Sequence, residues 1–335
     1  MEKVFVNAKN GSYEIQIGKD LLNASYLQKY TDYAVVTDDI VYGLYADRFP
    51  GAKFIVLKAG EGSKNLANLE MIYDKLMEFG IDRGGAIAAL GGGVVGDIAG
   101  FAAATFKRGI AFVQYPTTLL AQVDSAVGGK VAVNLSAGKN MAGTFYQPAA
   151  VFADTGTLAT LDARQFSAGM AEIIKYAYIA DAQLHKWLMK DEKEIASIIC
   201  RCCEIKADYV RQDPYDTGVR MQLNYGHTIG HAIETAAGYG VFLHGEAVAI
   251  GMEYAARLGE KMGISPKGLA EDTAFLLEKY GLPTCVEEDL LNRALSHLEA
   301  DKKAEGNMLH FVLLDKIGHA VLKKLEFDWI KKNIK

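Results

Sequence analysis

The chain has 335 residues, of which 50% are hydrophobic and 23% charged, a balance that is typical of globular proteins with two ordinary domains. Its formal net charge of -5 argues against a nucleic-acid-binding surface, and no apolar run is long enough to span a membrane. The N-terminal segment alternates like a strand and lacks the apolar core of a secretion signal. We therefore expect a cytoplasmic protein. Its clustered cysteines (Cys200, Cys202 and Cys203) are expected to be reduced and to lie in the protein core, on a helix with one apolar face.

The first half of the chain alternates strand and helix patterns. Short β-rich runs predict strands at residues 4–6, 13–17, 33–37, 53–57, 86–90 and 111–115. Between them, apolar residues at three- and four-residue steps predict a helix over residues 66–79. This alternation predicts a Rossmann-like α/β domain with a mostly parallel sheet, which we place at residues 1–155.

From about residue 161 the patterns become helical. Helices are predicted at residues 194–210, 225–237, 246–262 and 269–280. One short strand pair is expected near residues 309–313 and 320–322. We therefore expect a mainly helical domain over residues 156–335, with the active site in the cleft between the two domains.

A glycine-rich turn follows the apolar strand predicted at residues 86–90. Gly91, Gly93 and Gly96 match the spacing of a dinucleotide-binding turn, in which backbone N–H groups approach a pyrophosphate at a helix N-terminus. Such turns also occur where only packing requires them. The usual acidic residue about twenty positions downstream is missing from the sequence. The acidic candidates lie upstream instead, at Asp38, Asp39 and Glu61.

Three histidines and a carboxylate form a second group of candidates. His227 and His231 are four residues apart on a helical pattern, so they share one face, and His244 follows. Upstream, Glu172 and Lys175 share another helical face. Two or three histidines with one carboxylate are the ligand set of a catalytic divalent metal. The alternative is a pair of surface or capping histidines.

A third feature is a set of polar residues within apolar or small-residue segments. These residues are Arg108, Asp124, Lys130, Lys139, Asn140, Lys175, Lys206, Arg220, Lys302 and Lys303. Lys130 has neighbours without any amphipathic pattern, so it does not mark an ordinary solvated face. Cations in such places, in a chain that is acidic overall, indicate binding of phosphate and carboxylate groups.

Long motifs in nearly the whole chain resemble the 3-dehydroquinate synthase family. They lie, in order, at residues 108–125, 128–130, 138–140, 169–175, 220–234, 244–246, 301–303 and 311–318. The resemblance implies a homodimeric, NAD- and metal-dependent lyase of the shikimate pathway, which leads to chorismate and the aromatic amino acids, with Zn2+ or Co2+ as the metal. It also implies the reaction: 3-deoxy-D-arabino-heptulosonate 7-phosphate is oxidised by NAD, loses phosphate, is reduced again and closes by an intramolecular aldol step.

The resemblance implies a role for each matching residue. The metal ligands would be Glu172, His227 and His244. The NAD contacts would be Asp38, Glu61, Lys64, Gly92, Gly93, Asp97, Thr117, Thr118, Lys130, Lys139 and Thr160.

The substrate-binding residues follow from the same resemblance. The phosphate would be held by Lys130, Asn140, Asn224 and one of Lys302 or Lys303, with Lys139 nearby. The carboxylate would be held by Lys206 and Arg220, and the ring hydroxyls by Asp124 and Lys175. His231 would transfer protons, and Arg108 would reach into the phosphate pocket of the other subunit.

One segment departs from the family pattern. The usual Thr-Leu-Pro-x-Arg-Glu is replaced by Thr160-Leu161-Asp162-Ala163-Arg164-Gln165, which leaves the local loop geometry open. The rival interpretations are another sugar phosphate cyclase of secondary metabolism, a metal-dependent polyol dehydrogenase and a non-catalytic scaffold. Asn224 and the pair Lys206 and Arg220 favour the dehydroquinate reaction.

Overall fold

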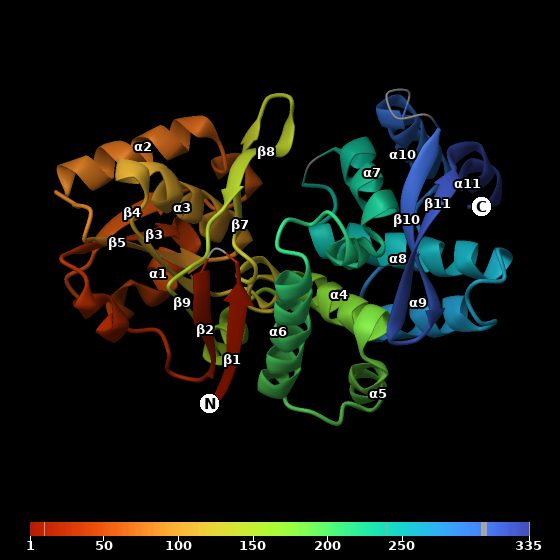
Figure 1. The fold of residues 1–335 in the computed structure, drawn as a ribbon, viewed down its shortest axis with the longest axis horizontal. Coiled ribbons are helices and arrows are strands. Elements are labelled where there is room, and N and C mark those ends of the chain that lie inside the picture. Colours follow the sequence, from red (N-terminus) through yellow and green to blue (C-terminus); the bar gives the residue numbers. More distant parts are fainter. Residues whose placement is uncertain (10, 239, 303–306, 335) are drawn as a thin grey trace. The chain divides into compact units, whose positions relative to one another are not determined.

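Two compact units make up the chain in a computed structural model (Figure 1). The residues that the structure describes are 1–9, 11–238, 240–302 and 307–334. The first unit comprises Met1–Leu161 and Ile195–Tyr215, and the second comprises Asp162–Glu194 and Asp216–Lys335.

This division differs from the one expected from the sequence, which put every residue after 155 in the second domain. Helix α6 (Ile195–Gln212) belongs to the first unit because it packs against the N-terminal strands β1 (Glu2–Ala8) and β2 (Gly11–Gly18), beside which Figure 1 shows it. The first unit is therefore not continuous in sequence.

A seven-stranded sheet in the order β1-β2-β9-β6-β5-β3-β4 is the centre of the first unit. The other five strands are β3 (Tyr33–Asp38), β4 (Lys53–Leu57), β5 (Ala86–Gly91), β6 (Ala111–Pro116) and β9 (Ala150–Asp154). β1 pairs with β2 in antiparallel fashion, and all other neighbours in the sheet are parallel. The mostly parallel sheet is thus confirmed.

The strands have apolar sequences because both faces of this sheet are covered. In β3, Ala34 and Val36 belong to one hydrophobic cluster, whereas Val35 between them belongs to another. Alternate residues of a strand point to opposite faces, so a strand that is buried on both faces has a continuous apolar sequence. One cluster also includes the buried face of α2 (Leu66–Glu78).

Helix α3 (Gly93–Thr105) follows β5 directly, and Gly92 is its N-cap residue. This strand, glycine turn and helix are the arrangement that the sequence predicted. A separate hairpin of β7 (Lys130–Leu135) and β8 (Gly138–Phe145) completes the unit with α1 (Asp39–Tyr45).

The second unit is mainly helical, as expected. Its helices are α4 (Ala163–Ala180), α5 (Ala182–Lys190), α7 (His227–Ala237), α8 (His244–Lys261), α9 (Leu269–Lys279), α10 (Glu288–Lys302) and α11 (Phe327–Asn333). Helix α8 contacts α4, α7 and α9, and the predicted strand pair is the antiparallel hairpin of β10 (Met308–Lys316) and β11 (His319–Glu326). Among the described residues, no helix has the length and apolar character to cross a membrane.

Candidate active site

Close helix crossings in the second unit bring its chemical groups together. A side chain at Gly245 of α8 would place its Cβ 1.9 Å from the carbonyl oxygen of Ala168 in α4. A side chain at Gly251 would likewise lie 1.9 Å from the carbonyl oxygen of Gly226, just before α7. Because glycine lacks a Cβ, the backbones approach to contact distance. Helix α4 carries Glu172, α7 carries two histidines, and α8 begins with the third.

Gly245→Ala is therefore expected to lower the free energy of unfolding by about 3 kcal/mol, because the new methyl group meets backbone that cannot rotate away. Urea denaturation measures this change. Gly43→Ala is the matched control, since Gly43 lies in helix α1 and its Cβ would meet no atom within 4 Å. The control should be neutral or slightly stabilising. Equal midpoints for the two variants would contradict the close crossing.

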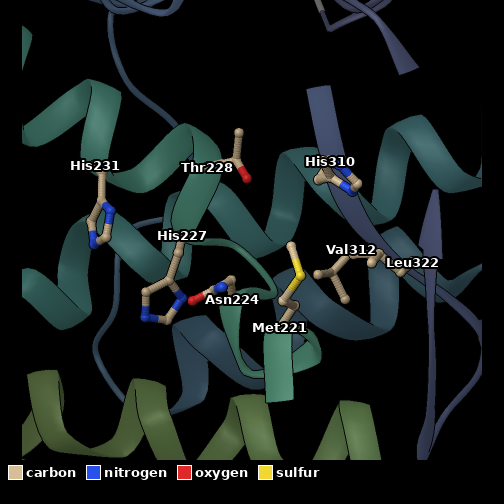
Figure 2. A pocket seen from close by; sticks show the side chains of 8 residues that line it. All are labelled: Met221, Asn224, His227, Thr228, His231, His310, Val312 and Leu322. Carbon is tan, nitrogen blue, oxygen red and sulfur yellow. The ribbon is translucent and has the colours of Figure 1, made fainter. Parts of the chain in front are cut away.

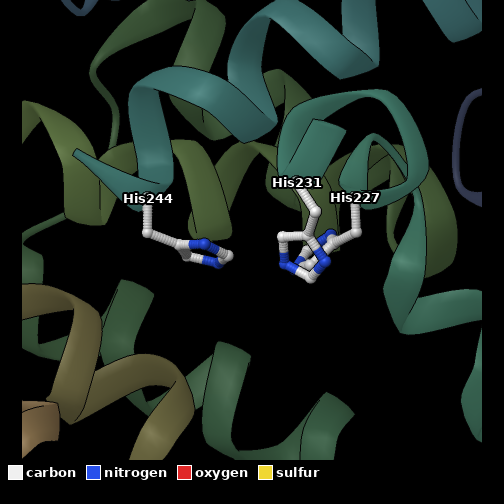
Figure 3. A group of neighbouring side chains, drawn as sticks. All are labelled: His227, His231 and His244. Carbon is white, nitrogen blue, oxygen red and sulfur yellow. The ribbon is translucent and has the colours of Figure 1, made fainter. Parts of the chain in front are cut away.

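Three histidines of the second unit, His227, His231 and His244, surround one space (Figure 3). One ring nitrogen from each of His227, His231 and His244 lies within 4.8 Å of the others. Glu172 adds a carboxylate, because its Oε1 lies 3.6 Å from Nε2 of His227 and 3.5 Å from Nε2 of His244. Histidine nitrogens and one carboxylate oxygen fit a divalent transition metal.

Two of these histidines are oriented through their other ring nitrogen. Nδ1 of His227 lies 3.1 Å from the carbonyl oxygen of Tyr225, and Nδ1 of His244 lies 3.2 Å from Oε2 of Glu234. Such contacts leave Nε2 directed at the shared space. Glu234 was not among the residues that the sequence indicated. Its position, seven residues after His227 on the same helix, could have indicated it, since such residues share a face.

The surroundings of His227 and His244 have opposite effects on the two pKa values. Burial, helped by the charge of Lys175, lowers the pKa of His227 to about 3. At His244 burial also lowers the pKa, but hydrogen bonds to Glu172 and Glu234 outweigh it and raise the pKa to about 9. His227 therefore has a neutral imidazole at neutral pH. His244 lies between two carboxylates, which stabilise a positive charge on or next to its ring.

The predicted shared face of Glu172 and Lys175 is confirmed. The two side chains form an ion pair, and each is only 2% exposed. Arg220, also fully buried, and Asn224 lie in the short 3-10 helix η7 (Val219–Asn224) just before α7. Four of the expected substrate or metal residues thus lie on α4 and on the segment that leads into α7.

The segment that departs from the family pattern forms the start of α4. Asp162 is the N-cap, and its carboxylate accepts hydrogen bonds from the backbone N–H groups of Arg164 and Gln165. Arg164 in turn binds both carboxylate oxygens of Glu246, at 2.6 and 2.8 Å. Glu246 closes a capping interaction with the N–H of Leu243 at 2.8 Å, next to His244. The segment that differs from the family pattern therefore still forms an ordered start of α4, because aspartate is a good N-cap residue.

In the first unit, Lys64 connects two of the expected site residues. Its ammonium group, which is almost fully buried, donates hydrogen bonds to Asp97 and Asn140. Burial raises the pKa of Asp97, although Lys64 opposes this effect. A parallel link joins Glu61 to Asn134, whose amide lies 2.7 Å from Oε1 of the glutamate. The two links are joined, because the backbone N–H of Asn140 donates to Oδ1 of Asn134 at 2.9 Å. Three of the expected NAD contacts, Lys64, Asp97 and Glu61, thus belong to one polar network.

Several other expected NAD contacts lie at the ends of parallel strands. Gly92 and Gly93 start α3, and Thr117 and Thr118 follow β6. Asp38 ends β3 and caps α1 through the N–H groups of Ile40 and Val41. Thr160 forms a hydrogen bond with Tyr45.

Lys206 and Asp124 form a further pair in the first unit. Nζ of Lys206 lies 2.9 Å from Oδ1 and 2.7 Å from the backbone oxygen of Asp124. Lys206 lies on helix α6, so this helix brings the lysine to Asp124 within the first unit. Lys130 starts β7, and Lys139 lies in β8 beside Asn140. Of the two late lysines, Lys302 ends α10, and Lys303 lies outside the described residues.

Comparisons with known proteins match both units. The family model for the N-terminal part of 3-dehydroquinate synthase matches residues 54–168, and the model for its C-terminal part matches residues 169–304. The chain belongs to the 3-dehydroquinate synthase family. The 3-dehydroquinate synthase of Neisseria gonorrhoeae is 44% identical, over 97% of this chain and 96% of that protein.

Solved structures extend this family relationship to other sugar phosphate cyclases. A 2-deoxy-scyllo-inosose synthase complexed with carbaglucose-6-phosphate, NAD+ and Co2+ is 30% identical, with a TM-score of 0.88 and 99% of each chain covered. The 2-epi-5-epi-valiolone synthase ValA of Streptomyces hygroscopicus, with NAD+ and Zn2+ bound, is 28% identical, with a TM-score of 0.85 and 98% and 97% of the chains covered. Both are less similar in sequence than the 3-dehydroquinate synthase.

Proposed function

We infer that this chain is an NAD- and metal-dependent lyase that converts 3-deoxy-D-arabino-heptulosonate 7-phosphate to 3-dehydroquinate and phosphate. The observation that carries this inference is the 44% identity to a 3-dehydroquinate synthase over nearly the full length of both proteins. A cyclase of secondary metabolism is the second candidate, since two such enzymes share the fold at 30% and 28% identity. The lower identities favour the dehydroquinate reaction.

Glu172, His227 and His244 are our proposed metal ligands. The Glu172 carboxylate lies near Nε2 of both histidines, and each histidine is held at its other nitrogen. His231 is the exposed member of the histidine group, so we assign it proton transfer instead. Zn2+ and Co2+ both suit this donor set, and the related cyclases bind one or the other.

The polar network of Lys64, Asp97 and Glu61 and the glycine turn at Gly92 and Gly93 are proposed to bind NAD. NAD held by these residues would supply the hydride acceptor for oxidation of the C5 carbinol and the hydride for the later reduction, and a metal held by Glu172, His227 and His244 would supply polarisation of the carbinol oxygen. The residues fit a dinucleotide because Gly92 leaves backbone N–H groups open at the start of α3. The remaining expected contacts are Asp38, Thr117, Thr118, Lys130, Lys139 and Thr160.

The chain's own side chains orient the substrate. We assign the carboxylate to Lys206 and Arg220, and the ring hydroxyls to Asp124 and Lys175. The phosphate is assigned to Lys130, Asn140, Asn224 and one of the two late lysines. Fixed cations hold a flexible substrate in one conformation, which supplies much of the rate enhancement for an intramolecular closure.

Phosphate release tests this function. The chain, loaded with Zn2+ and a small amount of NAD, should release phosphate from the heptulosonate phosphate over many turnovers without accumulating NADH, because the hydride returns within each cycle. A hexose 6-phosphate serves as the control substrate for the second candidate. Stoichiometric NADH would indicate a dehydrogenase, and phosphate release from the hexose alone would indicate a different cyclase.

We also propose that the protein is a cytoplasmic homodimer in which Arg108 serves the site of the other subunit. Arg108 is exposed, and its side chain makes no hydrogen bond or ion pair with any residue that the structure describes. The backbone at Lys107 and Arg108 has positive φ angles of 49° and 70°. Two such residues in succession cost free energy, and this strain is typical of functional segments. Closed two-fold dimers are the commonest assemblies.

A further inference from the structure

A pocket of about 260 Å³ lies within the second unit, between the start of α7 and the β10–β11 hairpin (Figure 2). Its lining residues are Met221, Asn224, His227, Thr228, His231, His310, Val312 and Leu322. Figure 2 shows His227 and His231 on one side and His310, from β10, on the other. The hairpin therefore forms a wall of the same pocket that His227 and His231 line.

Three polar side chains of this pocket have hydrogen-bonding groups that are available to a ligand. The Asn224 amide, the Thr228 hydroxyl and the His310 imidazole make no hydrogen bond or ion pair with the described part of the chain. They come from three separate elements, namely η7, α7 and β10. Each can donate a hydrogen bond, so a ligand with several acceptor oxygens would satisfy all three.

The register of the hairpin adds a cation beside this group. His310 lies directly opposite Lys324 in β11, and Val312 lies opposite Leu322. Residues directly opposite in an antiparallel pair share one face, and every second residue of a strand returns to that face. Since His310, Val312 and Leu322 all line the pocket, Lys324 lies on the same face of the hairpin, next to His310.

We propose that His310, supported by Lys324, is a further residue that binds the phosphate group of the substrate. This inference rests on the proposed function, because it names the group that enters the pocket. Three donors from different directions suit the tetrahedral oxygens of a phosphate better than a planar carboxylate, and the lysine favours a doubly charged group. Val312 and Leu322 provide the apolar part of the wall.

Inorganic phosphate, a product of the reaction, tests the proposal by calorimetric titration of the protein loaded with Zn2+ and NAD. His310→Ala should weaken phosphate binding by about tenfold, the usual effect of one hydrogen bond to a charged group. His310→Gln, which keeps an N–H donor, should retain part of the affinity. His319→Ala is the matched control, since His319 lies on the same hairpin but its Nδ1 is 2.7 Å from Asp315 and it does not line the pocket.

Kinetics provide a second measurement. His310→Ala should raise KM for the phosphorylated substrate by about tenfold and leave kcat within about twofold, because the contact holds a group in the ground state. Binding of the unphosphorylated heptulosonate should not change. Equal weakening of both compounds, or unchanged phosphate affinity in a folded His310→Ala variant, would overturn the proposal. Failure of the proposed function would instead appear as absent turnover in the unaltered chain, whereas the phosphate titration does not depend on turnover.

Discussion

Glu172→Gln is expected to weaken metal binding by at least about a hundredfold, because a neutral amide replaces the anionic ligand between His227 and His244. It should also leave the ammonium group of Lys175, 2% exposed, without the carboxylate that it pairs with. Removing one partner of a buried ion pair costs about 3 kcal/mol of stability. Titration with Co2+ followed by absorbance measures the affinity, and urea denaturation of the metal-free protein measures the stability.

Glu253→Gln is the matched control. Glu253 is a glutamate of α8 that is 1% exposed and pairs with Arg257. Burial raises the pKa of its carboxyl group, so an amide of the same shape resembles the protonated form. This variant should bind metal normally. If both variants bind Co2+ equally well, or lose it equally, Glu172 is not a ligand.

Mixing two inactive variants tests the shared site, and the expected effect is the recovery of activity from almost none. Arg108→Ala and His231→Ala should each be nearly inactive as homodimers. If Arg108 serves the other subunit, a mixed dimer contains one site with both residues and one with neither. Random exchange of equal amounts makes about half of the dimers mixed, so about a quarter of the original activity should return.

The same mixture gives a different result if Arg108 serves its own chain. Every site then lacks one of the two residues, and no activity returns. Subunit exchange has to be confirmed independently, for example by tagging one variant and isolating the mixed dimer. A mixed dimer without activity would refute the shared site, whereas half of the original activity per mixed dimer would support it.

Much of the fold could be predicted because its local signals agree with its packing. The run at residues 53–57 has the bounds of β4, and the three- and four-residue steps of 66–79 match α2 to within one residue. Strand β9 (Ala150–Asp154) was not among the predicted strands, although its apolar sequence fits a strand that is buried throughout. The hairpin of β7 and β8 was missed because Gly138–Phe145 contains three polar residues and two glycines among its eight residues, a composition that disfavours a strand.

The grouping of elements into units could not be predicted by reading along the chain. Helix α6 has an ordinary amphipathic pattern, which predicts that one face is buried but not which partner covers it. For the same reason the link from Lys206 to Asp124 is a long-range contact that no local spacing indicates.

The candidate site was predictable where its residues share a helix. Glu172 with Lys175, and His227 with His231, lie on one face because of their spacing. The approach of His244 to Glu172 depends on the bare backbone at Gly245, and only tertiary packing determines it. The sequence did not indicate His310, for which we propose a role in phosphate binding, because a single histidine in a strand has no distinguishing pattern. Only the structure places it in the pocket that His227 and His231 line.

Helix α6 has a consequence for the order in which the protein is made. β1 and β2 leave the ribosome first, but the helix that packs against them follows only after α4 and α5 of the second unit. Until then, the strand surface that α6 covers remains open to solvent, and a nascent chain with such a surface is prone to aggregation. A chain that is interrupted before Ile195 therefore lacks part of its first unit, and this unit is complete only once synthesis has passed Tyr215.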